Sequence, residues 1–264
     1  MFYDAHVHLA AKALEDEFSN ILSSYGDIGL SKALVVGTCP DDWSGVFDLA
    51  AGDERFLPAV GLHPWEVNDA PDGWQEVFAR YLDEKGVRII GEIGLDQWIE
   101  DHDIDAQREA FEWQFRIAAE RNLPTSIHCL KAHEPILRSL REASIPDRGF
   151  KLHAYNGPPE TMKPLLEMGA YFSFNAGQLK PNAKNVYELI RLVPDERLLI
   201  ETDAPNFQLR SELREFALDD PELCHPANLR AGYRAIAKER GLSMDELAEQ
   251  VAGNFRRYFL NSSA

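Results

Sequence analysis

The stretch Phe2-Tyr3-Asp4-Ala5-His6-Val7-His8 lies at the start of the chain and is predicted to form a strand that carries a His-x-His motif. Because side chains alternate between the two faces of a strand, His6 and His8 point to the same side, about 7 Å apart along the strand. If the strand lines a barrel, both imidazoles face inward at its C-terminal end. Two ring nitrogens placed in this way can share one metal ion. An isolated His-x-His motif is, however, equally often structural.

Composition indicates a globular protein with a substantial core. The chain has 264 residues, of which 45% are hydrophobic and 27% charged, so we expect a single domain over residues 1–264. The net charge of −17 argues against a broad basic surface for gripping duplex nucleic acid. It leaves room for a small local site, since two divalent ions would add about +4 there. Otherwise the acidity is typical of a solvated surface that keeps a protein soluble.

Three cysteines are too few for a disulfide framework and suit a reducing compartment. The N-terminus lacks the basic and then apolar layout of a secretory signal. No apolar run approaches the roughly 18 residues that span a membrane. We therefore expect a cytoplasmic, soluble protein that has no membrane partner and needs no obligate protein partner.

Strand-like and helix-like stretches alternate along the chain. The strands are predicted at 2–8, 33–37, 56–61, 88–93, 124–128, 150–153, 170–174 and 197–200. An amphipathic segment through Leu22 follows the first strand, and further helices are predicted from Asp41, then over 71–84, around Phe111 and Phe115, and over 132–143, 158–168, 183–192, 226–240 and 243–258. This rhythm predicts the α/β class and a (β/α)8 TIM barrel, with a doubly wound open sheet as the alternative.

Two irregular stretches interrupt the rhythm. The first, 94–103, is predicted as a loop, and its Asp96 and Trp98 are open to either substrate contact or loop packing. The second, 205–226, follows the last strand. Loops of this length in compact domains are usually functional or disordered, so we expect a flap over the site here.

Candidate ligands lie at or just beyond the ends of the predicted strands, where barrel enzymes assemble their sites. They are His6, His8, Glu92, His128, His153 and Asp203. Imidazole and carboxylate without thiolate suit a catalytic ion, and Zn, Mn, Mg, Fe, Co and Ni are not distinguishable. Six ligands exceed what one ion with an open position needs. A pair of divalent ions fits the number better, and such a pair lowers the pKa of a trapped water, which predicts hydrolysis.

The sequence resembles the TatD family of metal-dependent hydrolases. The resemblance spans nearly the whole sequence and is carried by Asp4-Ala5-His6-Val7-His8, Gly61-Leu62-His63-Pro64-Trp65, Gly91-Glu92-Ile93-Gly94-Leu95-Asp96, His128, His153-Ala154-Tyr155-Asn156-Gly157, Glu201-Thr202-Asp203-Ala204-Pro205, Phe111-Glu112-Trp113-Gln114, 171–177 and 253–259.

The resemblance implies a ligand set and roles for its members. One metal would be held by His6, His8, Glu92 and Asp203, and the other by Glu92, His128 and His153, with Glu92 bridging. Asp203 would also act as general base. His63 would face the substrate, donating to a phosphate oxygen or leaving group, unless it is only a turn residue fixed by Pro64. Glu201 is expected to support or pack against the site rather than bind metal.

The chain departs from the family pattern at two positions. Where the family often has an arginine that helps bind phosphate, this sequence has Leu130 followed by Lys131, and the two cations bind phosphate with different geometry. The motif after the sixth strand is also altered, as His153-Ala154-Tyr155-Asn156-Gly157. We expect metal binding to survive both changes, with nucleic acid less firmly predicted as the substrate.

The resulting hypothesis is an enzyme, a two-metal hydrolase of phosphodiester bonds. It would be a deoxyribonuclease that acts as a 3'-5' exonuclease on single-stranded DNA or DNA ends. Its expected substrate contacts are His63, Lys131 and Arg210. One alternative is an amidohydrolase-type esterase, amidase or lactonase for a small molecule, favoured if those cations turn away and apolar residues line the mouth. A second is a non-catalytic, metal-loaded scaffold.

Overall fold

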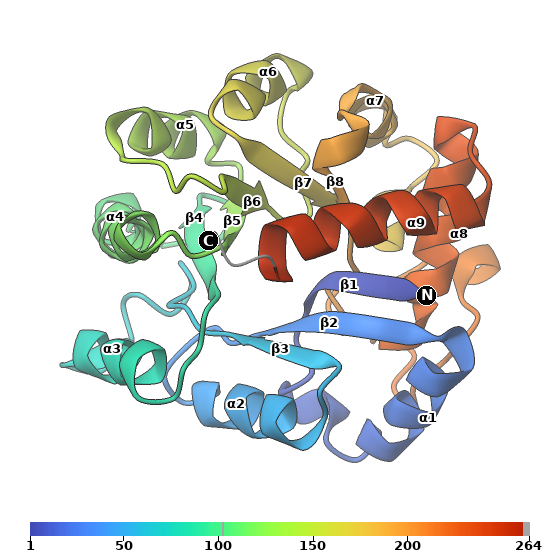
Figure 1. The fold of residues 1–264 in the computed structure, drawn as a ribbon, viewed down its shortest axis with the longest axis horizontal. Helices are drawn as coiled ribbons and strands as arrows, with labels where there is room; N and C mark the ends of the chain where they lie inside the picture. The colour runs from blue at the N-terminus through green and yellow to red at the C-terminus, as the bar shows by residue number, and fades with distance from the viewer. Residues whose placement is uncertain (102, 261–264) are drawn as a thin grey trace.

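A ring of parallel strands surrounded by helices forms the structure, a computed structural model that describes residues 1–101 and 103–260 (Figure 1). The strands are β1 (Phe2–Val7), β2 (Leu30–Val36), β3 (Phe56–Ala59), β4 (Ile90–Asp96), β5 (Thr125–Leu130), β6 (Phe150–Leu152), β7 (Ala170–Phe174) and β8 (Leu198–Ile200). All the hydrogen-bonded neighbours among them are parallel.

The helices are α1 (Phe18–Ile28), α2 (Trp43–Gly52), α3 (Trp74–Asp83), α4 (Ile104–Arg121), α5 (His133–Glu142), α6 (Pro159–Glu167), α7 (Lys184–Leu192), α8 (Leu229–Arg240) and α9 (Met244–Phe255). Helices α1 to α8 cover the outside of the ring, and α9 crosses one end of it (Figure 1). Short turns of 3-10 helix lie at Lys12–Leu14, Ala176–Gln178, Asp195–Arg197, Ser211–Leu213 and Pro226–Asn228, and a π turn at Arg256–Leu260. None of the described helices combines the length and apolarity that crossing a membrane requires.

Backbone hydrogen bonds close the ring at two seams. Strands β1–β3 and β4–β8 form two hydrogen-bonded groups, and a bridge between Val60 and Ile90 joins them on one side. On the other side the Asp203 amide donates to the His6 carbonyl, and the His8 amide to the Ala204 carbonyl, each at 2.9 Å. The predicted barrel is therefore closed, and the open sheet is excluded.

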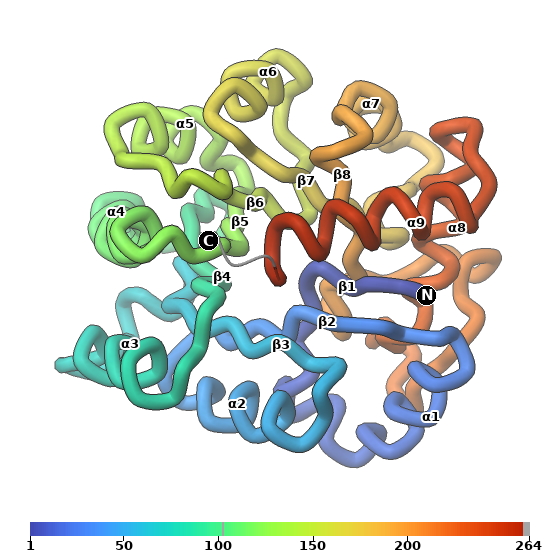
Figure 2. The backbone as a smooth tube through the Cα atoms, in the orientation of Figure 1, coloured from blue at the N-terminus to red at the C-terminus, as the bar shows by residue number. Residues whose placement is uncertain are grey.

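Helix α9 crosses the N-terminal end of the barrel (Figure 2). Its start is fixed by a capping box in which the Ser243 side chain accepts from the Glu246 amide and the Glu246 carboxylate accepts from the Ser243 amide. Beyond its end, the buried Tyr258 hydroxyl donates to the Thr125 carbonyl and accepts from the Thr125 amide, both at 2.8 Å. The opposite end of the barrel is left for the site.

Several predicted boundaries were wrong by three residues or more: β2 begins at Leu30, α3 at Trp74 and α8 at Leu229, and two further differences concern α1 and β4. Helix α1 begins at Phe18, after a 3-10 turn, and runs to Ile28 rather than ending near Leu22. Strand β4 continues through Asp96, although 94–96 was predicted as loop. Gly94 permits this, because it has a φ of +152° and a Cβ there would lie 2.0 Å from the His128 carbonyl oxygen of β5.

Gln114 ties helix α4 to the segment that carries His63. Its side chain is fully buried; Oε1 accepts from the Leu62 amide at 2.7 Å, and Nε2 donates to the Leu62 carbonyl at 3.2 Å. One side chain therefore satisfies both backbone groups just before the histidine.

We expect Gln114→Leu to lower the free energy of unfolding by about 2 kcal/mol, because it keeps the volume but leaves two buried backbone groups without partners. Urea unfolding measures this loss. The control is Arg116→Ala on the same helix, which removes an exposed pair with Glu120 and should cost less than about 1 kcal/mol. Equal stability of the two variants would contradict the assignment.

Candidate active site

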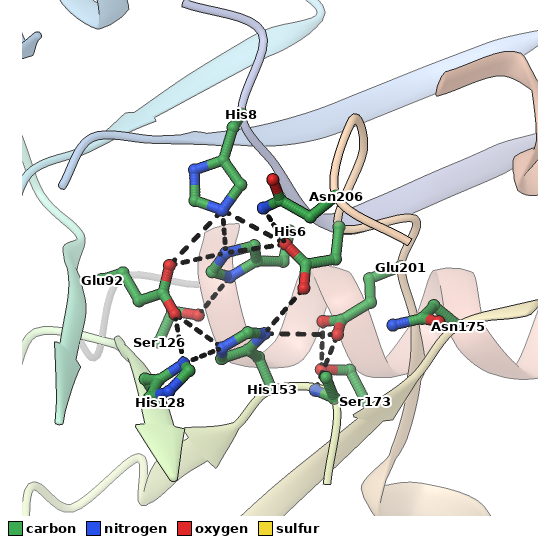
Figure 3. A network of polar contacts seen from close by, with 12 residues as sticks. His6, His8, Glu92, Ser126, His128, His153, Ser173, Asn175, Glu201 and Asn206 are labelled. Carbon is green, nitrogen blue, oxygen red and sulfur yellow. Dashed lines mark hydrogen bonds and ion pairs between the residues drawn. The ribbon is translucent and has the colours of Figure 1, made fainter. Parts of the chain in front are cut away.

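A cavity of about 1120 Å³ opens at the C-terminal ends of the strands. Its walls come from the segments after β1, β2, β3, β4 and β8 and from the ends of β5 and β6. The parallel strands all end on this face, so residues distant in sequence meet here, as in other barrels. At its floor, polar side chains converge (Figure 3).

One cluster of donor atoms joins β1 to the segment after β8. His6 Nε2 lies 3.2 Å from His8 Nε2, and each nitrogen approaches Glu92 Oε2, at 3.2 and 3.4 Å. Asp203 Oδ1 lies 3.2 Å from His8 Nε2 and 3.9 Å from His6 Nε2. Two imidazole nitrogens and two carboxylate oxygens thus face one point.

A second cluster lies on the other oxygen of the same carboxylate. Glu92 Oε1 is 2.8 Å from His128 Nδ1 and 2.7 Å from His153 Nε2, and these two nitrogens are 3.2 Å apart. In Figure 3 the Glu92 carboxylate lies between His8 on one side and His128 with His153 on the other. Glu92 therefore divides its two oxygens between two histidine pairs.

Three of the four histidines, His6, His128 and His153, face a polar side chain with the other ring nitrogen. Ser126 Oγ lies 2.8 Å from His6 Nδ1, and Asp96 Oδ2 lies 2.8 Å from His128 Nε2. Glu201 Oε1 lies 3.5 Å from His153 Nδ1. With the ring protons on these outer nitrogens, the inner nitrogens keep their lone pairs toward Glu92, as metal-binding histidines require.

The paired nitrogens fit a cation. Two imidazole lone pairs 3.2 Å apart repel each other unless a proton or a positive ion lies between them. Both the His6–His8 pair and the His128–His153 pair have this geometry, and both face a carboxylate oxygen. Other triads of donor atoms within 4.8 Å of one another are His6 with His153 and Glu201, and His63 with Glu92 and His128.

Protons balance the charge in the metal-free protein. Burial disfavours the charged form of Glu92, yet the surrounding imidazoles outweigh it and hold the pKa of this carboxyl well below its usual range. Burial, with the nearby charge of His153, lowers the pKa of His6 to about 3. Burial also opposes the charge on His153, but Glu92 and Glu201 overcome it and raise the pKa of His153 to about 10.

A buried ion pair supports the floor of the site. Lys151 is fully buried; its Nζ donates to the Ala5 carbonyl at 2.7 Å and lies 3.6 Å from Glu201 Oε2. Glu201 also accepts from the Ala154 amide at 2.7 Å and from the Ser173 hydroxyl. Burial raises the pKa of Glu201, but Lys151 with His153 lowers it to about 2. Glu201 thus has the supporting position predicted for it.

His63 lies beside the second cluster with a defined tautomer. Its Nδ1 accepts from the Trp65 amide at 3.1 Å, so in the neutral ring the proton lies on Nε2. That Nε2 is 3.3 Å from Glu92 Oε1, and His63 is one of the residues that line the cavity. The ring is therefore arranged as an N–H donor toward the cavity rather than as a lone-pair donor.

Two predicted substrate contacts lie elsewhere. Neither Lys131 nor Arg210 lines the cavity, and Arg210 pairs with Glu212 in its own segment at 3.1 Å. Lys131 has a φ of +54°, so the backbone turns sharply there, after Leu130, which does line the cavity. Among the described residues that line the cavity, Lys12 is the one lysine or arginine. Sequence reasoning missed it because the segment that follows β1 carries no ligand motif.

Most of the segment 205–226, which was predicted to cover the site as a flap, does not line the cavity. Only Asn206 and Phe207 of the segment 205–226 line the cavity. The remainder is held away from it: the Asn228 side chain accepts from the amides of Glu215 and Phe216, and the Asp219 amide donates to Glu17.

Comparison with known proteins agrees with this geometry. A family model described as TatD related DNase matches residues 3–260. An uncharacterized metal-dependent hydrolase, YcfH of Escherichia coli K12, is 30% identical over 259 residues, covering 97% of this chain and 94% of the relative. A 3'-5' ssDNA/RNA exonuclease TatD of Shigella flexneri is 28% identical over 258 residues, covering 97% and 98%.

A solved structure confirms the fold. The TatD homologue YJJV from Escherichia coli K12 matches with a TM-score of 0.89 at 23% identity, over 99% of this chain and 98% of that chain. The family model and the relatives confirm the family predicted from the strand-end motifs, and the solved structure confirms the barrel. With a family model over almost its whole length and a histidine–carboxylate site at the barrel mouth, the chain belongs to the TatD family of metal-dependent hydrolases.

Proposed function

We propose that this protein is a phosphodiesterase that uses two divalent ions to release nucleotides from the 3' ends of single-stranded DNA. The observation that carries the proposal is Glu92, whose two carboxylate oxygens each face a separate histidine pair. A carboxylate shared between two donor sets is the arrangement that a two-metal hydrolase site would need. Relatives named as ssDNA/RNA exonucleases support the choice of substrate.

The proposed ligands follow from the two clusters. His6, His8 and Asp203 would hold one ion with Glu92 Oε2, and His128 and His153 would hold the other with Glu92 Oε1. When bound, such a pair lowers the pKa of a water between the ions and stabilises negative charge on a phosphoryl oxygen. The donors, imidazole and carboxylate, are compatible with Zn, Mn, Mg, Fe, Co or Ni.

Asp203 and His63 take the proton-handling and orienting roles. Asp203 Oδ1 contacts His8, whereas Oδ2 lies 4.0 Å from His153 Nδ1 and is the oxygen that we assign to receive the proton of the attacking water. The His63 Nε2–H is directed into the cavity, where it donates to a phosphoryl oxygen or to the leaving oxygen. Ser126, Asp96 and Glu201 keep the histidine rings oriented.

A second candidate is hydrolysis of a carboxylic ester, lactone or amide of a small molecule. The specific observation in its favour is the lining of the cavity: Lys131 and Arg210 are absent from it, while Asp41, Asp42 and Glu66 are present. An acidic mouth does not attract a polyanion. The comparison of lysine variants below separates the two candidates.

We expect Glu92→Gln to lose both activity and metal, because the neutral amide removes the charge shared by the two donor sets. Asp203→Asn should lower kcat by about 10²- to 10⁴-fold through loss of the general base. The measurements are stepwise shortening of 5'-labelled single-stranded DNA and elemental analysis, which should find two ions per wild-type chain. Asp105→Asn, exposed on α4, is the control and should match wild type. A fully active Glu92→Gln protein with two bound ions would contradict the proposal.

We expect metal uptake to release protons and to tighten as pH rises from 6 toward 9. The sign follows from His153, whose pKa of about 10 in the metal-free protein leaves it protonated at pH 7, while a cation needs its lone pair. His8 and His128 act in the same direction, since carboxylate partners outweigh burial and raise the pKa of each. Calorimetric titration in two buffers of different ionisation enthalpy measures the protons released. A binding heat independent of the buffer would refute this charge balance.

We expect Lys12→Ala to raise KM about fivefold for a phosphodiester and to leave KM for a neutral ester unchanged, because Lys12 is the one lysine or arginine among the described residues that line the cavity. Lys131→Ala is the matched control, the same substitution at a lysine outside the cavity, and should change neither. If neutral esters are hydrolysed and phosphodiesters are not, the second candidate replaces the first.

A further inference from the structure

Two tryptophans form an exposed aromatic surface at the edge of the cavity. Trp65 follows β3 and Trp98 follows β4; their ring centroids are 6.3 Å apart and the planes are inclined by 28°. Both line the cavity, and they are 46% and 55% exposed. Of the five large hydrophobic side chains that are strongly exposed in the described residues, these two are the aromatic ones, and their rings are stacked.

Asp96 links this tryptophan pair to the catalytic cluster, by which we mean the two groups of donor atoms around Glu92. Its Oδ2 accepts from the Trp65 indole Nε1 at 2.8 Å and lies 2.8 Å from His128 Nε2. Its Oδ1 accepts from the Trp98 amide at 2.6 Å. Asp96 is itself fully buried. One carboxylate thus orients a proposed metal ligand, the Trp65 ring and the backbone of Trp98.

The tryptophan pair lies directly beside His63 and beside His128 of the second cluster. The Trp65 ring lies 5.3 Å from the His63 ring and 6.4 Å from the His128 ring, both measured between centroids. A planar group stacked on the two indole rings would therefore lie close to the bond that the proposed reaction cleaves. Nothing in the fold needs these rings to be exposed, and exposed aromatic pairs in a cavity usually mark a binding site.

The charges around the cavity favour a neutral contact. Lys12 is the one lysine or arginine among the described lining residues, and Asp41, Asp42 and Glu66 line the same cavity. A run of phosphates along this wall would meet carboxylates rather than lysines and arginines. Stacking of a base on an indole ring does not require a cation to neutralise a phosphate, and every nucleobase can stack in this way.

From these observations we infer that Trp65 and Trp98 form a nucleobase subsite, which holds the base of the terminal nucleotide while its phosphate lies at the catalytic cluster. This inference rests on the proposed function, and it adds how the substrate is recognised. The substrate is gripped by one base and one phosphate rather than along its backbone. Cleavage should accordingly favour a terminal residue that carries a base over an abasic one.

The test compares two ligands that share a phosphate and a deoxyribose and differ in the base. We expect calorimetry on the metal-loaded protein to give about tenfold tighter binding of dAMP than of 2-deoxyribose 5-phosphate. Trp98→Ala should weaken dAMP about tenfold and abolish the difference, whereas Trp98→Phe, which keeps a ring, should retain most of it. Trp98 is chosen because Trp65 also supports Asp96. Leu192→Ala, an equally exposed residue on α7, is the control and should behave as wild type.

The outcomes separate the subsite from the function. Equal binding of the two ligands by wild type, or unchanged dAMP binding in Trp98→Ala, overturns the subsite. If this occurs while single-stranded DNA is still shortened, the phosphodiesterase stands without it. If dAMP is preferred and Trp98→Ala loses the preference, but no phosphodiester is cleaved, the site binds nucleotides and the proposed reaction is wrong.

Discussion

The Glu92 carboxylate is buried at the mouth of the barrel among five imidazole rings, whose nearest nitrogens lie 2.7–3.4 Å from its oxygens. A carboxylate cannot remain charged in such a place unless positive charge compensates it. In the metal-free protein that charge is a proton, held above all by His153. The same requirement makes the site suitable for divalent ions, which replace the proton where the lone pairs meet. The arrangement of the surrounding side chains follows from this one buried charge.

The closure of the barrel and the construction of the site use the same backbone. The hydrogen bonds that join the segment after β8 to β1 involve the His6 carbonyl, the His8 amide and the Asp203 amide. Asp203 adopts a positive φ of 52° there, a conformation that non-glycine residues hold only when their surroundings impose it. The seam therefore fixes where the carboxylate of Asp203 meets the two histidines, so the precision of the cluster is a property of the closed ring.

Most of this arrangement could be predicted from sequence because it depends on chain order. His6, Glu92 and His128 lie within strands and His153 directly follows one. Parallel strands in a barrel bring such positions together whatever sequence lies between them. Features that depend on packing were not predictable in this way. Strand β4 extends to Asp96 because Gly94 lets β5 approach closely, and nothing in the local pattern distinguishes that from a loop.

The direction of exposed side chains was the hardest property to predict. Lys131 is adjacent to a residue that lines the cavity, yet the sharp turn at its own backbone takes it out of the lining. Lys12 faces the cavity from a short 3-10 turn that no periodic pattern marks. Long surface side chains have little burial to fix them, so their position depends on the turn geometry of a few residues. Sequence order predicts which residues reach the floor, and it says much less about the rim.

The rim in turn decides how a chain of net charge −17 can act on an anionic substrate. Proteins that track a nucleic acid backbone spend many lysines and arginines on phosphates, and their binding weakens steeply with salt. This cavity offers one lysine, so in the proposed reaction the attraction to phosphate would come from ions held between Glu92 and its histidines. Such attraction acts at a single phosphate. Contact beyond it has to be neutral, and the indoles of Trp65 and Trp98 are the neutral surface nearest to the reacting centre. If the proposed ions concentrate positive charge at this one point, an acidic protein of this kind would be suited to the end of a nucleic acid chain rather than to its length.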